Sequence, residues 1–390
     1  MRKSTHCDSS VLFIERIVPA YRVPFFLAMY ELLRRASIKL AVVGGACMPS
    51  EYLTNSLVEL PFGHPIHNHY LFRSIYWQSG LLQLAKSSQL IITGQENRSL
   101  TTNMIVLRRR LTRRPPLIAF YDHGPVSAGS SLYSSLNYAL KKSLSLRADW
   151  WFAYTELSKS RLIQAGYNQS RITVVNNAID TLKLSEAVEK ITPEELTSLY
   201  NKLFGENITS TDSVVIAISC TRLIAEKKIK ALLTALDMIY ATTSHFRMLV
   251  IGDGPMKSDL QNFCRSRSWC KYLGVLYGKE RNQYFALADV WLNPGTVGLT
   301  VLDAFASSAP LFTTTSPSHG PEICYLEHNN NGVITTDDVT QYANSVTQVI
   351  QNPKELQRMQ ASARQSALHY SLDSMVNHFS SGIVKALSAG

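Results

Sequence analysis

The sequence is poor in the features that mark membrane-spanning, secreted and low-complexity proteins. No stretch reaches the roughly 18 consecutive apolar residues that a helix across a bilayer needs. The apolar run behind Arg2 and Lys3 covers only residues 11–14, which is too short for a secretory leader. The six cysteines form no C-x-x-C pair, which argues against a zinc site or a disulfide framework. We therefore expect a globular, cytoplasmic protein whose thiols stay reduced.

Acidic residues are scarce in the first half of the chain. Residues 1–180 hold 21 Lys and Arg against 10 Asp and Glu, whereas the remaining residues hold 18 against 19. The formal charge of +10 therefore lies in the first half alone. Such a half favours an anionic partner: a nucleic acid, acidic lipid headgroups or a phosphorylated substrate. Nucleic acid is the least favoured, because no helix-turn-helix, zinc-finger or RNA-recognition signature accompanies the charge.

Two successive series of short apolar strands alternate with amphipathic helices. The chain of 390 residues is long enough for two domains of ordinary size. Strands are expected at 11–17, 38–44, 90–93, 117–121, 151–154 and 172–175, and again at 214–219, 248–252, 272–275, 290–293, 311–314 and 333–335. Helices are expected at about 24–36, 100–111, 131–146 and 156–165, and after each of the first four strands of the second series. This alternation predicts parallel, doubly wound sheets.

We therefore predict an α/β fold of two Rossmann-like domains that face each other across a cleft. The expected N-terminal domain covers residues 1–181, a linker or helical connection covers 182–212, and the expected C-terminal domain covers 213–370. Residues 371–390 are expected to form a helix that packs back toward the N-terminal domain. Because ligands of open α/β sheets lie beyond the carboxyl ends of the strands, we look for functional residues in the loops that follow them.

The segment LNPGTVGLTVLDAFA (292–306) joins an expected strand to an expected helix. A helix N-terminus offers unpaired N–H groups and partial positive charge, so Gly298, Leu299 and Thr300 are candidates for a phosphate cradle. Asp303, about one turn later, could accept hydrogen bonds from the vicinal hydroxyls of a ribose. Together these features indicate a nucleotide. The alternative is an ordinary strand–helix junction in which Asp303 only favours the helix dipole.

Two further loops carry residues suited to a nucleotide. SCTRLIAEKKI (219–229) follows the first strand of the second series, with Arg222 at its tip and Lys227 where the next helix begins. Two cations there can hold a diphosphate and stabilise it as a leaving group, a task that other enzymes give to a metal ion; a solvated basic helix start is the alternative. YLGVLYG (272–278) ends another strand where a base could lie, although Tyr277 can equally belong to the core.

The order of the motifs resembles one family of enzymes. The second half carries, in sequence, T-R-L-I-x-E-K, G-D-G-P, Y-L-G-x-x-Y, A-D-V-W-L-N-P-G, G-L-x-x-x-D-A-F-A and H-G-P-E-I, which is similar to the retaining glycosyltransferases of family four, whose fold is GT-B. The first half carries YRVPFF (21–26), GQENR (94–98), YDHG (121–124) and VVNNAID (174–180), which resemble members that build bacterial surface polysaccharides such as the lipopolysaccharide O-antigen. The resemblance covers nearly the whole chain.

The resemblance implies roles for the matched residues of the second half. It implies a transferase that moves a hexose or N-acetylhexosamine from a nucleotide-diphosphate sugar and retains the anomeric configuration. Arg222 and Lys227 would contact the diphosphate, and Gly298, Leu299 and Thr300 would supply backbone amides to it. Asp303 stands where the family usually has a ribose-binding Glu. The resemblance implies no metal and no cofactor beside the donor.

His123, in YDHG, matches the histidine that faces the donor sugar from the N-terminal domain of this family. An imidazole at the end of a strand can hydrogen-bond a sugar hydroxyl or stabilise positive charge at the anomeric carbon. A structural histidine beside Asp122 is the alternative. No protein nucleophile is expected, because retaining members are thought to let the departing phosphate deprotonate the acceptor on the same face of the sugar.

Two departures from the family pattern concern the donor sugar and the acceptor. The family commonly has a second Glu eight positions before the ribose acid, where this chain has Gly295. Glu322 in SHGPEI (318–323) is the candidate replacement, and helix capping is the alternative role. The first N-terminal loop commonly carries a glycine pair, whereas this chain has VPAYRVP (18–24), in which Arg22 is a candidate for an acceptor phosphate. Asn97 and Arg98 complete the acceptor-side candidates.

The cationic half also carries a candidate membrane surface. A short stretch holds a cluster of arginines: Arg108, Arg109, Arg110, Arg113 and Arg114. The expected helix at 131–147 has leucines on one side and lysines elsewhere: Leu132, Leu136, Leu140 and Leu144, with Lys141 and Lys142. Such a surface can dock on anionic headgroups, each nearby cation contributing on the order of 1 kcal/mol. The alternative is that the leucines pack on the sheet while the arginines are solvated.

The sequence thus predicts an enzyme of bacterial cell-envelope polysaccharide synthesis. We expect it to lie peripherally on the inner face of the cell membrane and to use a lipid-pyrophosphate-linked saccharide or a polysaccharide as acceptor. Two alternatives share the fold: a nucleotide-sugar epimerase, which would leave the basic half without a role, and a non-catalytic nucleotide-sugar binder, which the missing Glu at Gly295 suggests. The donor sugar, the nucleotide, the acceptor, the linkage and the oligomeric state stay open.

Overall fold

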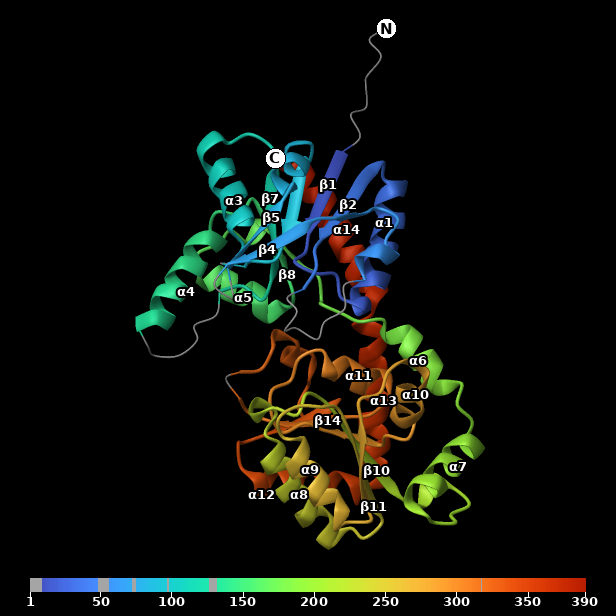
Figure 1. The fold of residues 1–390 in the computed structure, drawn as a ribbon. Coiled ribbons are helices and arrows are strands. Elements are labelled where there is room, and N and C mark those ends of the chain that lie inside the picture. Colours follow the sequence, from blue (N-terminus) through green and yellow to red (C-terminus); the bar gives the residue numbers. More distant parts are fainter. Residues whose placement is uncertain (1–8, 48–55, 72–74, 97, 126–131, 317) are drawn as a thin grey trace. The chain divides into compact units, whose positions relative to one another are not determined.

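The computed structural model divides the chain into two compact units, each with its own parallel sheet (Figure 1). The N-terminal unit comprises Met1–Ile179 with Leu372–Gly390, and the C-terminal unit comprises Asp180–Ser371. The structure describes residues 9–47, 56–71, 75–96, 98–125, 132–316 and 318–390, apart from the side chains of residues 132–137.

Seven parallel strands form the sheet of the N-terminal unit, in the order β3-β2-β1-β6-β7-β8-β9. They are β1 (Ser9–Ile14), β2 (Ile38–Gly44), β3 (Gly63–Pro65), β6 (Leu90–Thr93), β7 (Leu117–Asp122), β8 (Trp150–Ala153) and β9 (Ile172–Val174). All four residues of both β6 and β8 are buried, as expected of strands covered on both faces. Apart from β3, these strands match the first expected series.

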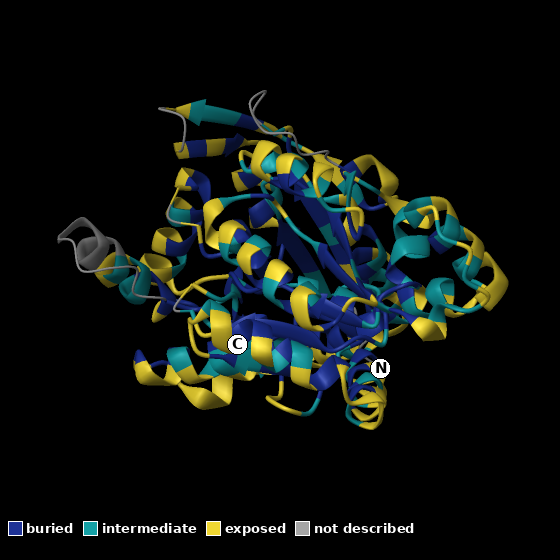
Figure 2. Ribbon diagram, turned by 90° about the horizontal axis from the view of Figure 1, so that it is seen from below, coloured by how far each residue is buried: buried dark blue, intermediate teal, exposed yellow. Residues whose placement is uncertain are grey.

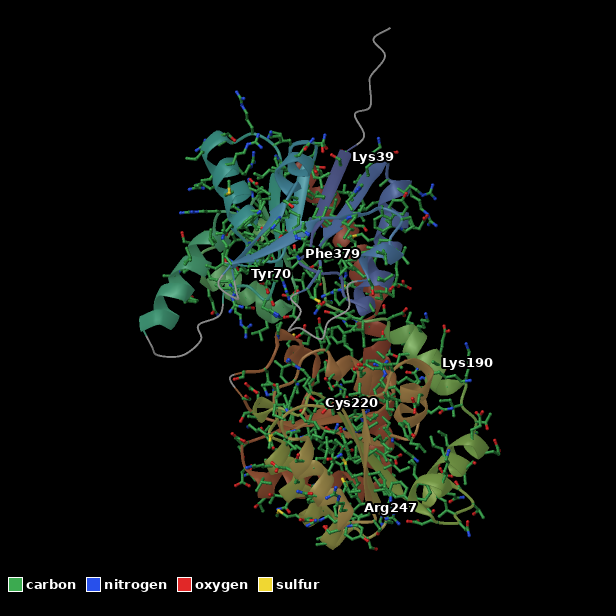
Figure 3. The ribbon with its side chains drawn as sticks, in the orientation of Figure 1. Lys39, Tyr70, Lys190, Cys220, Arg247 and Phe379 are labelled. Atoms are coloured by element: carbon green, nitrogen blue, oxygen red, sulfur yellow. The ribbon has the colours of Figure 1, made fainter. Side chains whose placement is uncertain are left out.

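Among its described residues the N-terminal unit has six α-helices: α1 (Val23–Arg35), α2 (Leu81–Lys86), α3 (Leu100–Thr112), α4 (Leu132–Ser145), α5 (Glu156–Gln164) and α14 (Leu372–Ser388). Helix α14 comes from the last residues of the sequence, and its side chain Phe379 packs into this unit (Figure 3). The Phe379 ring lies 4.5 Å from that of Phe152 and 5.2 Å from that of Phe25, between centroids. Such ring pairs anchor α14 in the core of this unit.

An antiparallel hairpin in the N-terminal unit was not expected from the sequence. It consists of β4 (His67–Leu71) and β5 (Ile75–Ser79). In β5 the residues alternate between exposed and buried, so that Tyr76 and Gln78 face inward while Ile75 and Trp77 face outward. The hairpin was missed because β4, with the sequence HNHYL, lacks the apolar run that identifies the other strands.

Six parallel strands form the sheet of the C-terminal unit, in the order β12-β11-β10-β13-β14-β15. They are β10 (Val215–Cys220), β11 (Phe246–Ile251), β12 (Cys270–Gly274), β13 (Val290–Leu292), β14 (Leu311–Thr314) and β15 (Gly332–Thr335). The second expected series is therefore also a parallel, doubly wound sheet.

The helices of the C-terminal unit are α6 (Thr181–Glu189), α7 (Pro193–Phe204), α8 (Ile229–Thr242), α9 (Lys257–Arg265), α10 (Gly278–Phe285), α11 (Thr300–Ala306), α12 (Val339–Ile350) and α13 (Pro353–His369). The polar stretch 182–212 thus contains α6 and α7. Arg247 on β11 forms an ion pair of 2.7 Å with Glu206, just beyond α7 (Figure 3). This pair ties the end of α7 to the sheet.

The strand order of each sheet reverses once, and the reversal marks where a ligand is expected. From β1 the chain adds β2 and β3 on one side and β6 to β9 on the other; from β10 it adds β11 and β12 on one side and β13 to β15 on the other. The loops after β1 and β6, and those after β10 and β13, leave their sheet in opposite directions, which opens a crevice at the carboxyl edge. Figure 2 shows the strands themselves largely buried between helices with exposed outer faces.

Candidate functional site

The two loops at the reversal point of the C-terminal sheet are bonded to each other. The loop after β10 contains a short helical turn, Ala225–Lys227, and the loop after β13 runs from residue 293 to α11. The Thr296 N–H donates to the Glu226 carbonyl at 2.9 Å, and Lys227 Nζ donates to the Thr296 carbonyl at 2.5 Å. The loops that carry the predicted diphosphate residues therefore form one structure.

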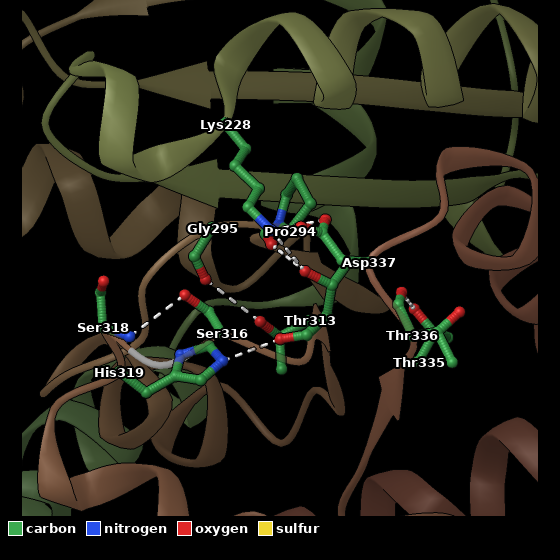
Figure 4. Close-up of polar contacts among 11 residues, drawn as sticks. Lys228, Pro294, Gly295, Thr313, Ser316, Ser318, His319, Thr335, Thr336 and Asp337 are labelled. Atoms are coloured by element: carbon green, nitrogen blue, oxygen red, sulfur yellow. Dashed lines mark hydrogen bonds and ion pairs between the residues drawn. The ribbon is translucent and has the colours of Figure 1, made fainter. Parts of the chain in front are cut away.

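Gly295 is required by this contact between the loops. A Cβ atom at position 295 would lie 2.3 to 2.4 Å from backbone atoms of Lys227 and Glu226, which real Cβ atoms do not tolerate. The carbonyl of Gly295 accepts from Thr313 Oγ1 at 3.2 Å, which fixes it from the other side (Figure 4). The space that a side chain at position 295 would need is therefore filled by the turn at residues 226–227.

His319 and Lys228 brace the same loops, and neither was singled out from the sequence. His319 Nδ1 accepts from the Val297 N–H at 2.9 Å, and Nε2 lies 2.8 Å from the Thr314 carbonyl (Figure 4). Burial, with the nearby lysines, lowers the pKa of His319, so the ring is neutral and carries its proton on Nε2. Lys228 Nζ bonds Asp337 at 2.6 Å, which leaves Lys227 as the lysine turned toward the loop after β13.

Arg222 and Lys227 form a pair of cations at this edge of the sheet. The Arg222 side chain is exposed, and it makes no hydrogen bond or ion pair within the described part of the chain. Burial, and secondarily the charge of Arg222, lowers the pKa of Lys227 to about 8. Because the charge of Arg222 disfavours the charged form of Lys227, a nearby anion would stabilise that form. The arrangement can therefore take up a phosphate or diphosphate group.

The predicted phosphate cradle begins α11. Gly298 has open space where a side chain would stand, and Leu299 caps the helix that starts at Thr300. The Gly298 carbonyl accepts from the Val301 N–H at 3.2 Å, which sets the first turn. The amides of this turn point away from the helix and lie on the loop that also contacts Lys227.

Asp303 lies on the first turn of α11, beside residues from two other elements. Burial raises the pKa of its carboxyl to about 6, an effect that Arg281 on α10 opposes. Its charge also raises the pKa of Cys220, at the end of β10, although burial is the larger cause (Figure 3). The nearby Tyr277, which precedes α10, is 78% exposed. The sequence left open whether Tyr277 belongs to the core, and its exposure shows that it does not.

Glu322 is buried next to the Gly298 turn. It belongs to the short helical segment Pro321–Tyr325 and is 3% exposed. The Gly320 N–H donates to the Val297 carbonyl at 2.7 Å, and a Cβ atom at Gly320 would lie 2.7 Å from Glu322 Oε2 and 3.3 Å from Gly298 Cα. The loop after β14 thus brings Glu322 up to the turn that begins α11.

In the N-terminal unit, His123 follows β7 as predicted. Its Nε2 lies 3.8 Å from Asp122 Oδ1, and its ring centroid lies 4.5 Å from that of Tyr154. Nδ1 is buried and has no hydrogen-bond partner among the described residues, while 43% of the side chain is exposed. The exposed part of the imidazole, and not Nδ1, is the part that a ligand can reach.

The acceptor-side candidates lie on the loops at the reversal point of the N-terminal sheet. Arg22 is 5% exposed; it donates to Asn177 Oδ1 at 2.9 Å and lies over the Tyr121 ring at 5.3 Å. Arg98 is exposed, and Asn97 lies outside the described residues. Glu15, on the same loop as Arg22 and not singled out from the sequence, has a carboxyl whose pKa burial raises to about 7, with Arg22 opposing the shift.

Comparison with known proteins connects this geometry to one family. Residues 214–352 match the family described as glycosyl transferases group 1. This stretch lies within the C-terminal unit. It contains both loops of the candidate site, and the resemblance stated from the sequence is thereby confirmed.

One curated relative of this chain is the alpha-monoglucosyldiacylglycerol synthase of Acholeplasma laidlawii. It is 29% identical over 185 residues, which are 46% of this chain and 44% of the relative. The match thus spans less than half of that protein.

Solved structures establish the fold. HepE of Anabaena, in complex with UDP, has a TM-score of 0.71 at 16% identity, covering 97% of this chain and 100% of that chain. The UDP-GlcNAc 2-epimerase of Neisseria meningitidis has a TM-score of 0.60 at 14% identity, covering 97% and 99%. The two parallel-sheet units and these neighbours identify the GT-B fold, as predicted. This fold is shared by transferases and epimerases.

Two features of the described residues concern membranes and metals. None of the helices within the described ranges combines the length and the hydrophobicity needed to cross a bilayer. No three His, Cys, Asp or Glu side chains of that part of the chain gather in a way that could hold a metal ion.

Proposed function

We propose that the protein is a glycosyltransferase that uses a nucleotide-diphosphate sugar. The observation that carries the proposal is the joined pair of loops at the reversal point of the C-terminal sheet, where Arg222, Lys227 and the Gly298 turn converge inside the stretch that matches the glycosyl transferases group 1 family. The family match by itself supports the fold, whereas these residues support the proposed chemistry. The solved structure of HepE contains UDP, which favours a uridine nucleotide in the donor.

In the proposed reaction the bond between the anomeric carbon and the diphosphate oxygen breaks. Arg222 and Lys227, with the amides of Gly298, Leu299 and Thr300, stabilise the negative charge that collects on the departing diphosphate. An acceptor hydroxyl attacks the anomeric carbon on the same face, and its proton passes to the departing phosphate oxygen, so the configuration is retained. The two cations do what a metal ion does in other enzymes, and we propose that no metal is needed.

The remaining donor contacts are assigned by position. Asp303 would accept hydrogen bonds from the ribose hydroxyls, and the exposed ring of Tyr277 would lie against the base. Glu322, buried beside the Gly298 turn, would bond the sugar hydroxyls. The family resemblance gives this role to a Glu at the position where this chain has Gly295. His123 stays a sequence-based candidate for a sugar contact.

For the acceptor we propose a lipid-pyrophosphate-linked saccharide in bacterial cell-envelope polysaccharide synthesis. Arg22 and Arg98 lie on the loops at the reversal point of the N-terminal sheet, where an anionic group is expected. The curated relative is named for a synthase of a glucosylated diacylglycerol, which favours a lipid acceptor. Asn97 stays a sequence-based candidate.

A lipid acceptor requires contact with a membrane, and α3 offers a suitable surface. Four apolar side chains spaced along one face of α3 are exposed: Leu100 by 39%, Met104 by 56%, Leu107 by 51% and Leu111 by 75%. Four exposed arginines lie on α3 or just beyond it: Arg108, Arg110, Arg113 and Arg114. An apolar row flanked by cations fits an anionic lipid surface.

The structure changes which residues can form this membrane surface. Leu144, expected on an exposed leucine stripe, is buried in the core, as the alternative interpretation held. Leu140 is exposed by 53%, and the side chains of Leu132 and Leu136 lie outside the described ones. Arg109 is engaged with Asp149 through two hydrogen bonds of 2.9 Å, so it is not one of the available cations.

Sedimentation with vesicles tests the membrane proposal. We expect the protein to sediment with vesicles that contain acidic phospholipid, and Leu107→Ser with Leu111→Ser to reduce the bound fraction several-fold. The matched control is Leu368→Ser, which changes an exposed leucine on α13 of the other unit. Equal binding to neutral and acidic vesicles would contradict the proposal.

Release of nucleoside diphosphate from a panel of UDP- and GDP-sugars, with and without lipid-linked acceptors and with and without a chelator, tests the activity. Loss of one charge-assisted contact costs about 1.5 to 3 kcal/mol, so Arg222→Ala and Lys227→Ala should each lower kcat/KM about tenfold to a hundredfold. Lys230→Ala, an exposed lysine on the next helix, is the control. An epimerase would interconvert the donor without any acceptor, and a non-catalytic binder would bind the donor without turnover.

A further inference from the structure

Two cysteines of the C-terminal unit touch each other, although nothing in their sequence spacing marks them as a pair. Cys264 lies near the end of α9, and Cys270 is the first residue of the edge strand β12. Their sulfur atoms are 3.2 Å apart, and both are free thiols. A disulfide has sulfur atoms about 2.0 Å apart, so a shift of roughly 1 Å would bring the two to bonding distance.

The pair opens on a pocket that can admit a small reagent. This pocket, of about 300 Å³, is lined by both cysteines and by Arg265, Lys271 and their neighbours Gln261 and Tyr272. Cys264 is partly exposed, whereas Cys270 is 1% exposed. A reagent that enters would therefore reach Cys264 first, and the two cations would attract one that carries negative charge.

The pKa values of the two thiols are shifted in opposite directions, which suits a reaction at one thiol followed by a reaction at the other. The hydrogen bond from Cys270, together with the charges of Lys271 and Arg267, lowers the pKa of the Cys264 thiol. The same hydrogen bond, together with burial, raises the pKa of the Cys270 thiol. Because the thiolate is the nucleophile, Cys264 is the better attacking group and Cys270 the better second thiol.

We propose that Cys264 and Cys270 form a modification site that reacts with anionic low-molecular-weight disulfides and closes to an internal disulfide between α9 and β12. The Cys264 thiolate attacks one sulfur of the reagent; the reagent's disulfide breaks, a mixed disulfide forms at Cys264, and the first thiol leaves. Cys270 then attacks the Cys264 sulfur, and the second thiol leaves. Two protein thiols are oxidised, one reagent disulfide is reduced to two thiols, and those thiols keep the two protons.

The experiment uses the whole protein and oxidised glutathione, which is anionic at neutral pH. After incubation and alkylation without reductant, trypsin cuts behind Arg265 and behind Lys271, so Cys264 and Cys270 fall on separate peptides that only a disulfide joins. We expect the joined peptides, a loss of mass equal to two hydrogen atoms in the intact protein, and reversal by dithiothreitol. Oxidation should be several-fold faster with glutathione disulfide than with the cationic disulfide cystamine.

Variants separate the two steps. Cys270→Ser should trap one glutathione on Cys264, whereas Cys264→Ser should leave Cys270 unmodified because it is buried. Cys324→Ser, which removes an exposed cysteine outside this pair, is the control and should not affect the cross-link. A stable glutathione adduct on Cys264 of the unchanged protein, or modification of Cys324 with both other thiols untouched, would overturn the proposal. The measurement does not depend on the proposed transferase activity, so either can fail alone.

Discussion

The pH dependence of nucleotide binding gives the sharpest test of Lys227. In the free protein the pKa of this lysine is about 8, because its ammonium is partly buried and lies near Arg222. A bound diphosphate would hold the ammonium charged and raise that pKa. Binding energy from Lys227 is therefore fully present below pH 8 and is lost as the pH rises through the free-protein value, because the proton must then be taken up on binding.

The size of the effect follows from the same pKa. Between pH 7 and pH 9 the protonated fraction of a group with a pKa of about 8 falls from roughly nine tenths to roughly one tenth, so the affinity should fall about tenfold, or about 1.4 kcal/mol. The terminal phosphate of the ligand, with a pKa near 6, is about nine tenths ionised at pH 7 and gains negative charge as the pH rises, so it cannot cause a decline. Isothermal titration of UDP from pH 6.5 to pH 9.5 measures the decline directly.

Two substitutions assign the decline to Lys227. Lys227→Arg places a cation that stays charged at every pH of the titration, so the affinity should become flat up to pH 9.5. Lys230→Arg is the matched control and should keep the decline of the unchanged protein. A flat curve in the unchanged protein, or the same decline in Lys227→Arg, would refute the assignment of a lowered pKa and a diphosphate contact to Lys227.

Three further predictions follow from contacts described above. Gly295→Ala should lower nucleotide affinity at least tenfold with unchanged circular dichroism, because the new Cβ displaces the turn at residues 226–227; unaltered affinity would show that the turn is not part of the site. Asp303→Asn should weaken binding of UDP more than binding of pyrophosphate, since it removes an acceptor for ribose hydroxyls and not a phosphate contact, and Asp303→Glu should restore most of the difference; equal weakening for both ligands would contradict the role. Phe379→Ala should lower the free energy of unfolding by about 3 to 5 kcal/mol in urea titrations, as a large buried side chain leaves a cavity, whereas a change below 1 kcal/mol would show that α14 is not anchored by this ring.

The strands were predictable from the sequence because they are runs of apolar residues between polar loops. The segments LIIT of β6 and LFTT of β14 are buried along their whole length, and their limits agree with expectation to the residue. The hairpin β4–β5 was missed because β4 is largely polar and both strands are only partly buried. The polar stretch at 182–212 gave no strong periodicity, and its helices α6 and α7 were expected only as a helical connection.

The candidate site was predictable only where a motif carries it. Arg222, Lys227 and Gly298 stand in loops, and Asp303 on the first turn of α11, in segments whose residue types and order point to a nucleotide. The roles of His319 and Lys228 depend on contacts made after folding, such as the bond from the Val297 N–H to His319 and the ion pair of Lys228 with Asp337. No local pattern encodes such contacts, and the close approach at Gly295 became visible only once the two loops were seen together.

The central claim is that Arg222, Lys227 and the turn at Gly298 hold one diphosphate, and a crystal structure with bound UDP tests it most directly. The account predicts the two phosphates within hydrogen-bonding distance of the Arg222 guanidinium, of Lys227 Nζ and of at least one amide from Gly298 to Thr300, with the ribose hydroxyls on Asp303. A diphosphate bound away from both loops, or one held by the Gly298 turn while Arg222 and Lys227 make no contact with it, would contradict the account.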